Sequence, residues 1–326
     1  MDIKTEIIDK LYTLSPQYDF LHTNSDLKNI ALLTLSGSHA YGTSNQNSDI
    51  DLRGVLIEGK TSVLGFNQFE QFEDKKTDTV IFGLRKFMSL CAKGNPNTLE
   101  LLGTDEDAII YMNEAGRKLK ENAHLFLSKR VIGSFGQYAN SQLRRLENAL
   151  CHDSFNNQRK TEHLATTLAN QIEHFNRVYS PLKRFHIYPE ADGLFFDVEA
   201  KKYPVKDFVN IYSEMSQIIR TYEKLNNRNK KKSEAHLNKH IMHLVRLLLT
   251  GADIMEEKGI MTRRTEEHEL LMDLRNGTYS LDEVFTLIKA HQEQFALIAS
   301  QTTLPQLPDM EKIEQLMICL YEEHLY

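Results

Sequence analysis

Cysteine is scarce in this chain of 326 residues. Its three cysteines lie far apart in apolar, helix-like surroundings: Cys91, Cys151 and Cys319. An odd number of scattered cysteines favours neither a disulfide framework nor a zinc site, because the first pairs its thiols and the second groups them. We therefore expect all three to be reduced residues that take part in packing.

Long hydrophobic runs are missing as well. No apolar stretch approaches the roughly 20 residues of a membrane-spanning helix, and the N-terminal residues 1–6 have no secretory character. Internal repeats and low-complexity linkers are also missing. The sequence therefore predicts a cytoplasmic protein without membrane association, which folds as two domains with a substantial core.

The chain has no overall excess of positive charge. Its formal net charge of −6 argues against a nucleic-acid footprint that covers the whole surface. Positive charge is concentrated locally, at Lys224, Arg228, Lys230, Lys231, Lys232, Lys239 and Arg246. Residues 226–233 are polar and lack helical periodicity, so we expect an exposed loop there. A solvated surface and an RNA contact both remain open for this loop.

The order of apolar segments predicts an α+β fold with a small mixed sheet. Strands are expected at residues 30–36, 49–58 and 78–83, and helices at residues 3–14 and 84–93. From about residue 105 the pattern becomes helical. We therefore predict a small domain with this mixed sheet and the N-terminal helix over residues 1–105 and a mostly helical domain over residues 106–326.

The second part of the chain follows a helical pattern with one interruption. Helices are expected at residues 113–125, 128–151, 160–178, 205–226, 235–258, 266–275, 281–299 and 309–324. Residues 185–197 break the pattern, since Pro189 and an Asp192-Gly193 turn lie between aromatic and apolar runs. This arrangement indicates a hairpin or an ordered loop.

The most informative segment of the chain begins with a small-residue turn. The apolar run 30–35 ends at Gly37 and Ser38, which open a turn or a helix N-terminus. Because Gly37 has no Cβ, the backbone can approach an anion closely, and the Ser38 hydroxyl lies beside free N–H groups. The turn is therefore a candidate site for a triphosphate.

About ten residues later, charged side chains alternate along an expected strand. Asp49, Asp51 and Arg53 would share one face, because side chains i and i+2 of a strand point the same way. Two carboxylates this close repel each other unless a cation lies between them, and hard oxygen ligands suit Mg²⁺ or Mn²⁺. Phosphoryl and nucleotidyl transfer use such a site with two ions.

A third carboxylate is needed to hold the ion that activates the attacking hydroxyl. Asp78 is the candidate, since it opens a strand-like run that pairs beside the Asp49 strand. Glu73 and Asp74 are its rivals. For Arg53, the favoured prediction is a salt bridge to one of the ligand carboxylates.

The segment resembles the nucleotidyltransferase fold of the DNA polymerase β superfamily. Within it, the chain is similar to the predicted nucleotidyltransferases of the RNA-repair-associated polymerase β family of bacteria and phages, in residues 42–55, 84–102 and 239–247. The resemblance implies a metal-dependent enzyme that moves an NMP from an NTP. The implied metal ligands are Asp49, Asp51 and Asp78, and the implied triphosphate-binding residues are Gly37 and Ser38.

Basic residues form a row on the expected helix at residues 235–258. Lys239, His243 and Arg246 fall at i, i+4 and i+7, which places them on one face. The neighbouring faces are apolar, so the helix is largely buried and the row needs a partner. Nucleotide phosphates and acidic side chains of a structural network both remain open, and His243 also fits a satisfied core histidine.

Other polar residues near these motifs are weaker candidates. His39 and Tyr41 lie inside the turn, where each contacts base or sugar or simply shapes the loop. Ser48 completes the set of nucleotide-binding candidates. Arg275 has a structural explanation, because it fits the end of a helix that Gly277 caps.

Together these features predict nucleotidyl transfer. An acceptor hydroxyl attacks the α-phosphate of the NTP in line and pyrophosphate leaves, while the helical domain closes the cleft and selects the acceptor. The family association makes an RNA 3′ end, such as that of a damaged tRNA, the leading acceptor by analogy. A protein hydroxyl, a small-molecule hydroxyl, and a nucleotide-sensing or RNA-binding module without a complete metal site remain alternatives.

Overall fold

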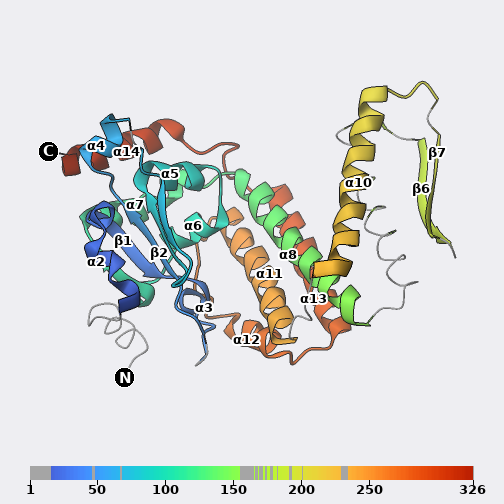
Figure 1. Cartoon of the computed structure of the whole chain (residues 1–326), viewed down its shortest axis with the longest axis horizontal. Helices are drawn as coiled ribbons and strands as arrows, with labels where there is room; N and C mark the ends of the chain where they lie inside the picture. The colour runs from blue at the N-terminus through green and yellow to red at the C-terminus, as the bar shows by residue number, and fades with distance from the viewer. Residues whose placement is uncertain are drawn as a thin grey trace. The chain divides into compact units, whose positions relative to one another are not determined.

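A computed structural model describes most of the chain (Figure 1). The described residues are 16–45, 48–66, 68–154, 165, 168, 172, 175–176, 179–181, 183–190, 193–199, 201–228 and 234–325. By its internal contacts the chain divides into two units, which we call unit 1 (residues 1–141 and 241–326) and unit 2 (residues 142–240). Unit 2 is therefore an insertion in the sequence of unit 1.

Unit 1 contains a mixed five-stranded sheet, as the sequence predicted. Its strands in spatial order are β3 (Gln71–Asp74), β4 (Thr79–Gly83), β2 (Leu52–Leu56), β1 (Ile30–Leu35) and β5 (Ile109–Met112). β2 and β4 run parallel, and the other neighbours are antiparallel. β1 is an interior strand that is apolar and buried over nearly its whole length, which is typical of a strand covered on both faces.

One strand boundary differs from the prediction and concerns the aspartates. β2 begins at Leu52, so Asp49 and Asp51 precede the strand and do not alternate along it. β1 ends at Leu35, and the chain turns away at Gly37, which has a φ of 57°. The pairing of β1 with β2 stops at Leu35 and Leu52. The alternation of strand side chains that predicted the direction of Asp49 therefore does not apply to it.

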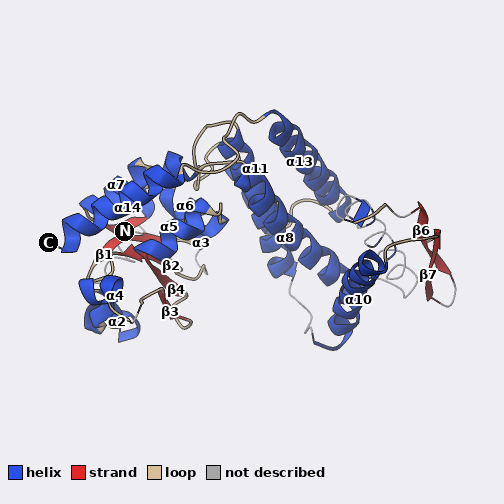
Figure 2. Cartoon of the chain, turned by 90° about the horizontal axis from the view of Figure 1, so that it is seen from above, coloured by secondary structure: helices blue, strands red, loops and turns tan. Residues whose placement is uncertain are grey.

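Helices cover both faces of the sheet (Figure 2). On one face lie α5 (Leu84–Ala92) and α7 (Glu114–Glu121). On the other lie the short helices η1 (Pro16–Tyr18), α2 (Phe20–Thr23) and η2 (Ser25–Leu27). Tyr18 and Leu27 from these short helices pack with Ile81 of β4 in the core of that side.

The other helices with residues in unit 1 largely follow the predicted pattern. They are α3 (Gly37–Tyr41), α4 (Lys60–Leu64), α6 (Pro96–Leu102), η3 (Glu106–Ala108), η4 (Ala123–Phe126), α8 (Arg130–Ser154), α11 (Glu234–Met255), α12 (His268–Asn276), α13 (Leu281–Gln301) and α14 (Met310–Leu325). α8 and α11 continue into unit 2. The sequence analysis did not predict α6, which starts at the Asn95 N-cap with Pro96 as its first residue.

Two strands were also not predicted. β3 is polar because it is an edge strand that pairs with β4 alone. β5 is a run of four residues, too short for its periodicity to distinguish a strand from a helix. Since β5 pairs with β1, the chain still contributes to the sheet beyond residue 105, and the two units differ from the predicted domains 1–105 and 106–326.

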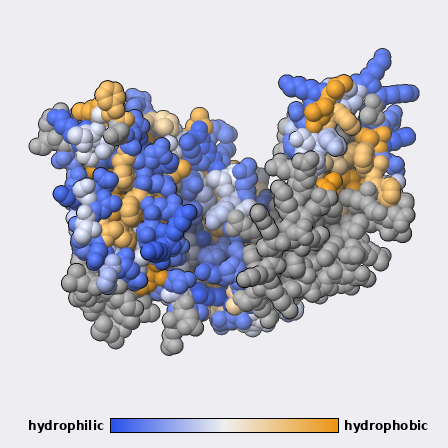
Figure 3. Space-filling model, viewed as in Figure 1, coloured by the Kyte–Doolittle hydropathy of each residue, from blue (hydrophilic) through white to orange (hydrophobic). Residues whose placement is uncertain are grey.

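Unit 2 contains a hairpin and a long helix. β6 (Lys183–Glu190) and β7 (Gly193–Glu199) are antiparallel, which confirms the predicted hairpin. α10 (Val205–Arg228) contributes Ile211 and Met215 to two small cores. Large hydrophobic side chains are exposed on β7 and α10: Phe195, Phe196, Val205, Phe208, Val209 and Tyr212. Figure 3 shows hydrophobic residues gathered on this part of the surface.

Several predictions fall on residues without a description. The helix at 3–14, most of the helix at 160–178 and the basic residues 230–232 lie outside the described residues. Of the cysteines whose side chains are described, Cys91 is buried, whereas Cys319 is exposed on α14, so the packing role predicted for Cys319 is wrong. None of the described helices is long and apolar enough to cross a membrane.

Candidate active site

Three chain segments meet at one edge of the sheet in unit 1. The C-terminal end of β1 lies beside the N-terminal ends of β2 and β4. The Ser36 N–H donates to the Asp51 carbonyl at 2.8 Å, and the Leu52 N–H donates to the Asp78 carbonyl at 3.3 Å. The turn after β1 and the aspartates that precede β2 and β4 therefore share this edge.

Gly37 brings the turn into contact with one of the aspartates. It is the first residue of α3, and its φ of 57° favours glycine. A Cβ at this position would overlap Asp51 Oδ2 and lie 3.3 Å from Asp51 Cγ. The preceding Ser36 makes no side-chain capping bond, so its hydroxyl does not occupy the first N–H groups of α3.

The three predicted metal ligands are not grouped in this structure. Asp49 is exposed, and Asp51 is half-buried against Gly37. Asp78 is instead paired with Arg53, whose Nη2 lies 3.0 Å from Asp78 Oδ1 and whose Nη1 donates to the Asp78 carbonyl. Among the described residues, no three His, Cys, Asp or Glu side chains lie close enough together to hold a metal ion. The predicted salt bridge of Arg53 is confirmed, and it engages the third carboxylate.

The donors at this edge nevertheless fit a hard divalent cation. Asp51 offers carboxylate oxygens beside the turn, and Mg²⁺ is usually bound by one or two carboxylates together with substrate phosphates. In the same region His39 Nε2 and Thr43 Oγ1 are buried and have no hydrogen-bond partner among the described residues. Buried polar atoms are nearly always hydrogen-bonded, so unpartnered ones are typical of a site that receives a ligand.

The rivals of Asp78 have other roles. Asp74 lies opposite Thr79 at the same edge, but its carboxylate accepts from the N–H and the hydroxyl of Thr77 at 2.9 and 2.7 Å. These two hydrogen bonds lower the pKa of Asp74. Glu73 is an exposed residue of β3. Burial raises the pKa of Tyr18, and the charges of Asp51 and Asp74 raise it further.

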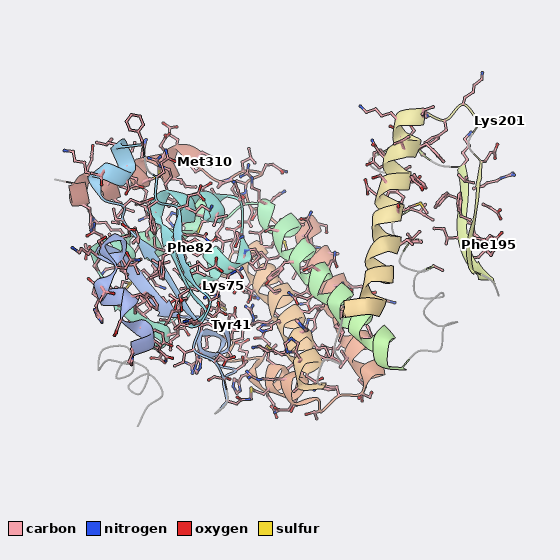
Figure 4. All side chains as sticks on the ribbon, in the orientation of Figure 1. Tyr41, Lys75, Phe82, Phe195, Lys201 and Met310 are labelled. Carbon is pink, nitrogen blue, oxygen red and sulfur yellow. The ribbon has the colours of Figure 1, made fainter. Side chains whose placement is uncertain are left out.

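The end of α3, where Figure 4 labels Tyr41, is held by a buried charged cluster. The Tyr41 hydroxyl donates to Glu100 Oε2 at 3.0 Å, and Arg246 Nη1 donates to Glu100 Oε1. The guanidinium carbon of Arg246 lies 3.5 Å from the centre of the Tyr41 ring. Burial raises the pKa of Tyr41, and the charge of Arg246 opposes this effect. Glu100 is therefore the acidic partner that the sequence left open for Arg246.

The three residues of the predicted basic row on α11 differ in their burial and in their contacts. Lys239 is exposed and belongs to unit 2, whereas Arg246 is only 2% exposed in unit 1. His243 is half-buried, and its ring meets the Tyr41 ring edge-on at 5.8 Å. Binding of nucleotide phosphates by these three residues stays a prediction.

Residues of α12 that the sequence analysis did not assign to the site contact the chain between α3 and β2. Arg275 donates to the Thr43 carbonyl and, at 3.0 Å, to Ser48 Oγ. His268 Nε2 lies 2.9 Å from the Gly42 carbonyl oxygen. The predicted helix end is confirmed, since Gly277 caps α12 with a φ of 75°. No local pattern signals the contacts of Arg275, because 227 residues separate it from Ser48.

Comparison with known proteins gives a match over nearly the whole chain. The family model RlaP, described as the RNA repair pathway DNA polymerase beta family, matches residues 3–316. This range contains every residue placed at the sheet edge above. No curated protein matches the chain.

Proposed function

Because the chain belongs to the RNA repair pathway DNA polymerase beta family, we propose that it transfers an NMP from an NTP to a 3′ hydroxyl of RNA, with tRNA as the leading acceptor. Membership in this family implies nucleotidyltransferase activity in general. The RNA acceptor is the finer part of the proposal and rests on the association with RNA repair. The observation that carries the proposal is the Asp51 carboxylate lying against Gly37.

The proposed roles follow from the geometry of the sheet edge. The first N–H groups of α3 bind the phosphates of the NTP, since Gly37 lets an anion approach and Ser36 leaves these donors uncapped. Asp49 and Asp51 would hold Mg²⁺ or Mn²⁺. Two such ions, when bound, lower the pKa of the acceptor hydroxyl and neutralise charge on the leaving pyrophosphate.

The third carboxylate and the helical part of the chain complete the proposal. Asp78 lies beside the Asp51 segment because β2 and β4 pair in parallel, and Arg53 balances its charge. We assign Asp78 as the remaining metal ligand. Selection of the acceptor is assigned to residues 106–326.

A labelling experiment tests the proposal. The protein is incubated with each α-labelled NTP, with Mg²⁺ or Mn²⁺, and with separate pools of tRNA, protein and metabolites. We expect label in RNA, and loss of that label in Asp49→Asn and Asp51→Asn. Asp105→Asn is the matched control, because Asp105 is exposed and its side chain makes no capping bond.

Each result of this experiment has a distinct meaning. Label confined to protein or to a metabolite would overturn the RNA acceptor and retain nucleotidyl transfer. Transfer that persists in Asp51→Asn would overturn the assignment of the site. NTP binding without labelling of any pool would favour a nucleotide-sensing module. Chelation of divalent ions with EDTA should abolish labelling, and added Mg²⁺ should restore it.

A further inference from the structure

Asp49 lies on a stretch of chain without regular secondary structure. We call residues 42–45 and 48–51 the connecting segment, because they join α3 to β2. The segment starts at Gly42, where the Thr43 N–H donates to the Ser38 carbonyl at 2.9 Å. It ends at Asp51, whose carbonyl accepts from Ser36. Between these two points, side chains of α12 contact the segment.

Arg275 makes contacts at two places on the connecting segment. This residue lies in the last turn of α12 and is half-buried. One guanidinium nitrogen donates to the Thr43 carbonyl, and another donates to Ser48 Oγ at 3.0 Å. A planar guanidinium suits this bridge, because its donors have a fixed mutual geometry.

The Ser48 hydroxyl has a full set of hydrogen bonds within this arrangement. It accepts from the Asn45 N–H at 2.9 Å, donates to Asn45 Oδ1 at 3.1 Å, and accepts from Arg275. A hydroxyl has one donor and two acceptor positions, and all three are used. Ser48 therefore transmits the position of Arg275 to the residue that follows it, Asp49.

Other side chains hold the same segment. Burial lowers the pKa of His39 of α3, and the nearby backbone of Ser48 and Asp49 opposes this effect. His268 contacts the Gly42 carbonyl, and a Cβ on Gly42 would lie 3.2 Å from Arg263 Nε. The connecting segment thus lies between α3 on one side and α12 with the preceding Arg263 on the other.

The acceptors of Arg275 distinguish it from a structural ion pair. Among the described residues, both of its hydrogen-bond acceptors are neutral oxygens. Arg246 and Arg264, which are more deeply buried, each pair with a carboxylate. The cationic charge of Arg275 is therefore placed beside the segment that carries Asp49 and Asp51.

We infer that Arg275 is a positioning residue of the proposed reaction, which holds the connecting segment so that Asp49 is presented next to Asp51 and Gly37. The inference rests on the proposed function for its consequence in catalysis. It predicts that loss of the guanidinium loosens the segment and weakens metal binding through Asp49. Supporting residues around metal ligands typically contribute about 10- to 100-fold to metal affinity or activity.

The test uses the full chain with the variants Arg275→Gln and Arg275→Lys. Arg117→Gln is the matched control, since Arg117 is an exposed arginine of α7 that pairs with Glu114. Two measurements do not need turnover: hydrogen exchange of peptides that cover residues 42–51, and Mn²⁺ binding in the presence of a non-hydrolysable ATP analogue. A third measurement separates kcat from KM in the labelling assay.

In Arg275→Gln we expect faster hydrogen exchange of the backbone amides of the connecting segment and about tenfold weaker Mn²⁺ binding. The decrease in kcat should be larger than the increase in KM. Arg275→Lys should recover part of the Mn²⁺ affinity, because an ammonium group reaches one of the two acceptors but cannot bridge both. The variant Arg275→Gln with Asp49→Asn should bind Mn²⁺ no more weakly than Asp49→Asn alone, since the two residues act as one unit.

Two results would overturn the role of Arg275: unchanged exchange and Mn²⁺ affinity in Arg275→Gln, or additive losses in the double variant. Wild-type protein that binds Mn²⁺ and the analogue but transfers no label would overturn the proposed function alone, because the exchange and binding measurements test Arg275 without turnover. If Arg275→Gln does not fold, the exchange and Mn²⁺-binding measurements are made on Arg275→Lys and compared with the wild type.

Discussion

At the residue scale, Gly37 is required for two independent reasons. Its φ of 57° lies in the left-handed region, where a residue with a Cβ is strained by about 1–2 kcal/mol. Its missing Cβ also leaves the space that Asp51 Oδ2 occupies. Backbone conformation and the position of a candidate metal ligand are therefore linked through one residue.

The variant Gly37→Ala tests this link. The added methyl group displaces the Asp51 carboxylate, and a displacement of about 1 Å in an active site costs about 100-fold in rate. We expect kcat/KM for nucleotide transfer to fall by about that factor. Gly59→Ala is the control, because Gly59 has a φ of −67° and an added Cβ would meet no described atom within 4 Å. Equal activity of the two variants would contradict the prediction.

His291 of α13 gives a prediction about pH. Burial lowers its pKa, nearby Glu267 opposes this effect, and Arg264 reinforces it. The folded protein therefore binds fewer protons at this site than the unfolded chain does below a pH of about 6.5. Its contribution to the free energy of unfolding is fully present at neutral pH and is lost as the pH falls through that region.

Urea unfolding at pH 7.5 and at pH 5.5 measures this effect. His291→Gln should show a smaller loss of unfolding free energy between the two pH values than the wild type shows. His124→Gln is the control, since His124 is exposed. If the unfolding free energy of His291→Gln depends on pH as strongly as that of the wild type, other titratable groups cause this dependence.

At the element scale, periodicity predicted the elements that are long or buried. The interior strand β1 and helices such as α5 and α13 were found because apolar spacing reports burial directly. β3 and β5 were missed because a polar edge strand and a run of four residues lack that signal. The turn at Gly37 was predicted from local sequence alone.

Contacts between distant elements could not be predicted in the same way. The sequence indicated that Arg246 needs a partner, but Glu100 lies 146 residues away on a helix that was not predicted. A salt bridge of Arg53 was predicted because Arg53 was expected to share a strand face with the aspartates. Its partner is Asp78, which the parallel pairing of β2 and β4 brings beside it. Among the described residues no three carboxylates are grouped closely enough to hold a metal ion, and Asp78 is paired with Arg53, so the ligand set Asp49, Asp51 and Asp78 stays a prediction.

The cluster that joins α3, α6 and α11 gives a prediction about stability. Glu100 and Arg246 are 4% and 2% exposed, so Glu100→Gln leaves a buried guanidinium without its charged partner. Removing one member of a buried ion pair costs about 3–5 kcal/mol. We expect a loss of that size in urea unfolding, and a smaller loss in the double variant Glu100→Gln with Arg246→Met. A double variant as unstable as the sum of both single variants would contradict this coupling.

At the scale of the whole molecule, the C-terminal helix completes the sheet domain that the N-terminal part begins. Tyr321 of α14 donates to Glu58 Oε2 at 2.8 Å, and the Leu84 N–H at the start of α5 donates to the same oxygen at 3.0 Å. Glu58 follows the C-terminal end of β2, whereas the candidate site lies at its N-terminal end. The Tyr321–Glu58 hydrogen bond and the candidate site therefore lie at opposite edges of one sheet.

The variant Tyr321→Phe tests whether a change at one edge of the sheet affects stability without affecting activity at the other edge. It removes one of the hydrogen bonds to a buried carboxylate, and hydrogen bonds to charged groups contribute about 1.5–3 kcal/mol. We expect the free energy of unfolding to fall by about that amount, while kcat and KM of nucleotide transfer at 25 °C stay at wild-type values. Gly37→Ala should give the reverse pattern, with a large loss of activity for a loss of about 1–2 kcal/mol. If Tyr321→Phe lowered kcat as well, α14 would be coupled to the site through the sheet, and the assignment of separate edges would be wrong.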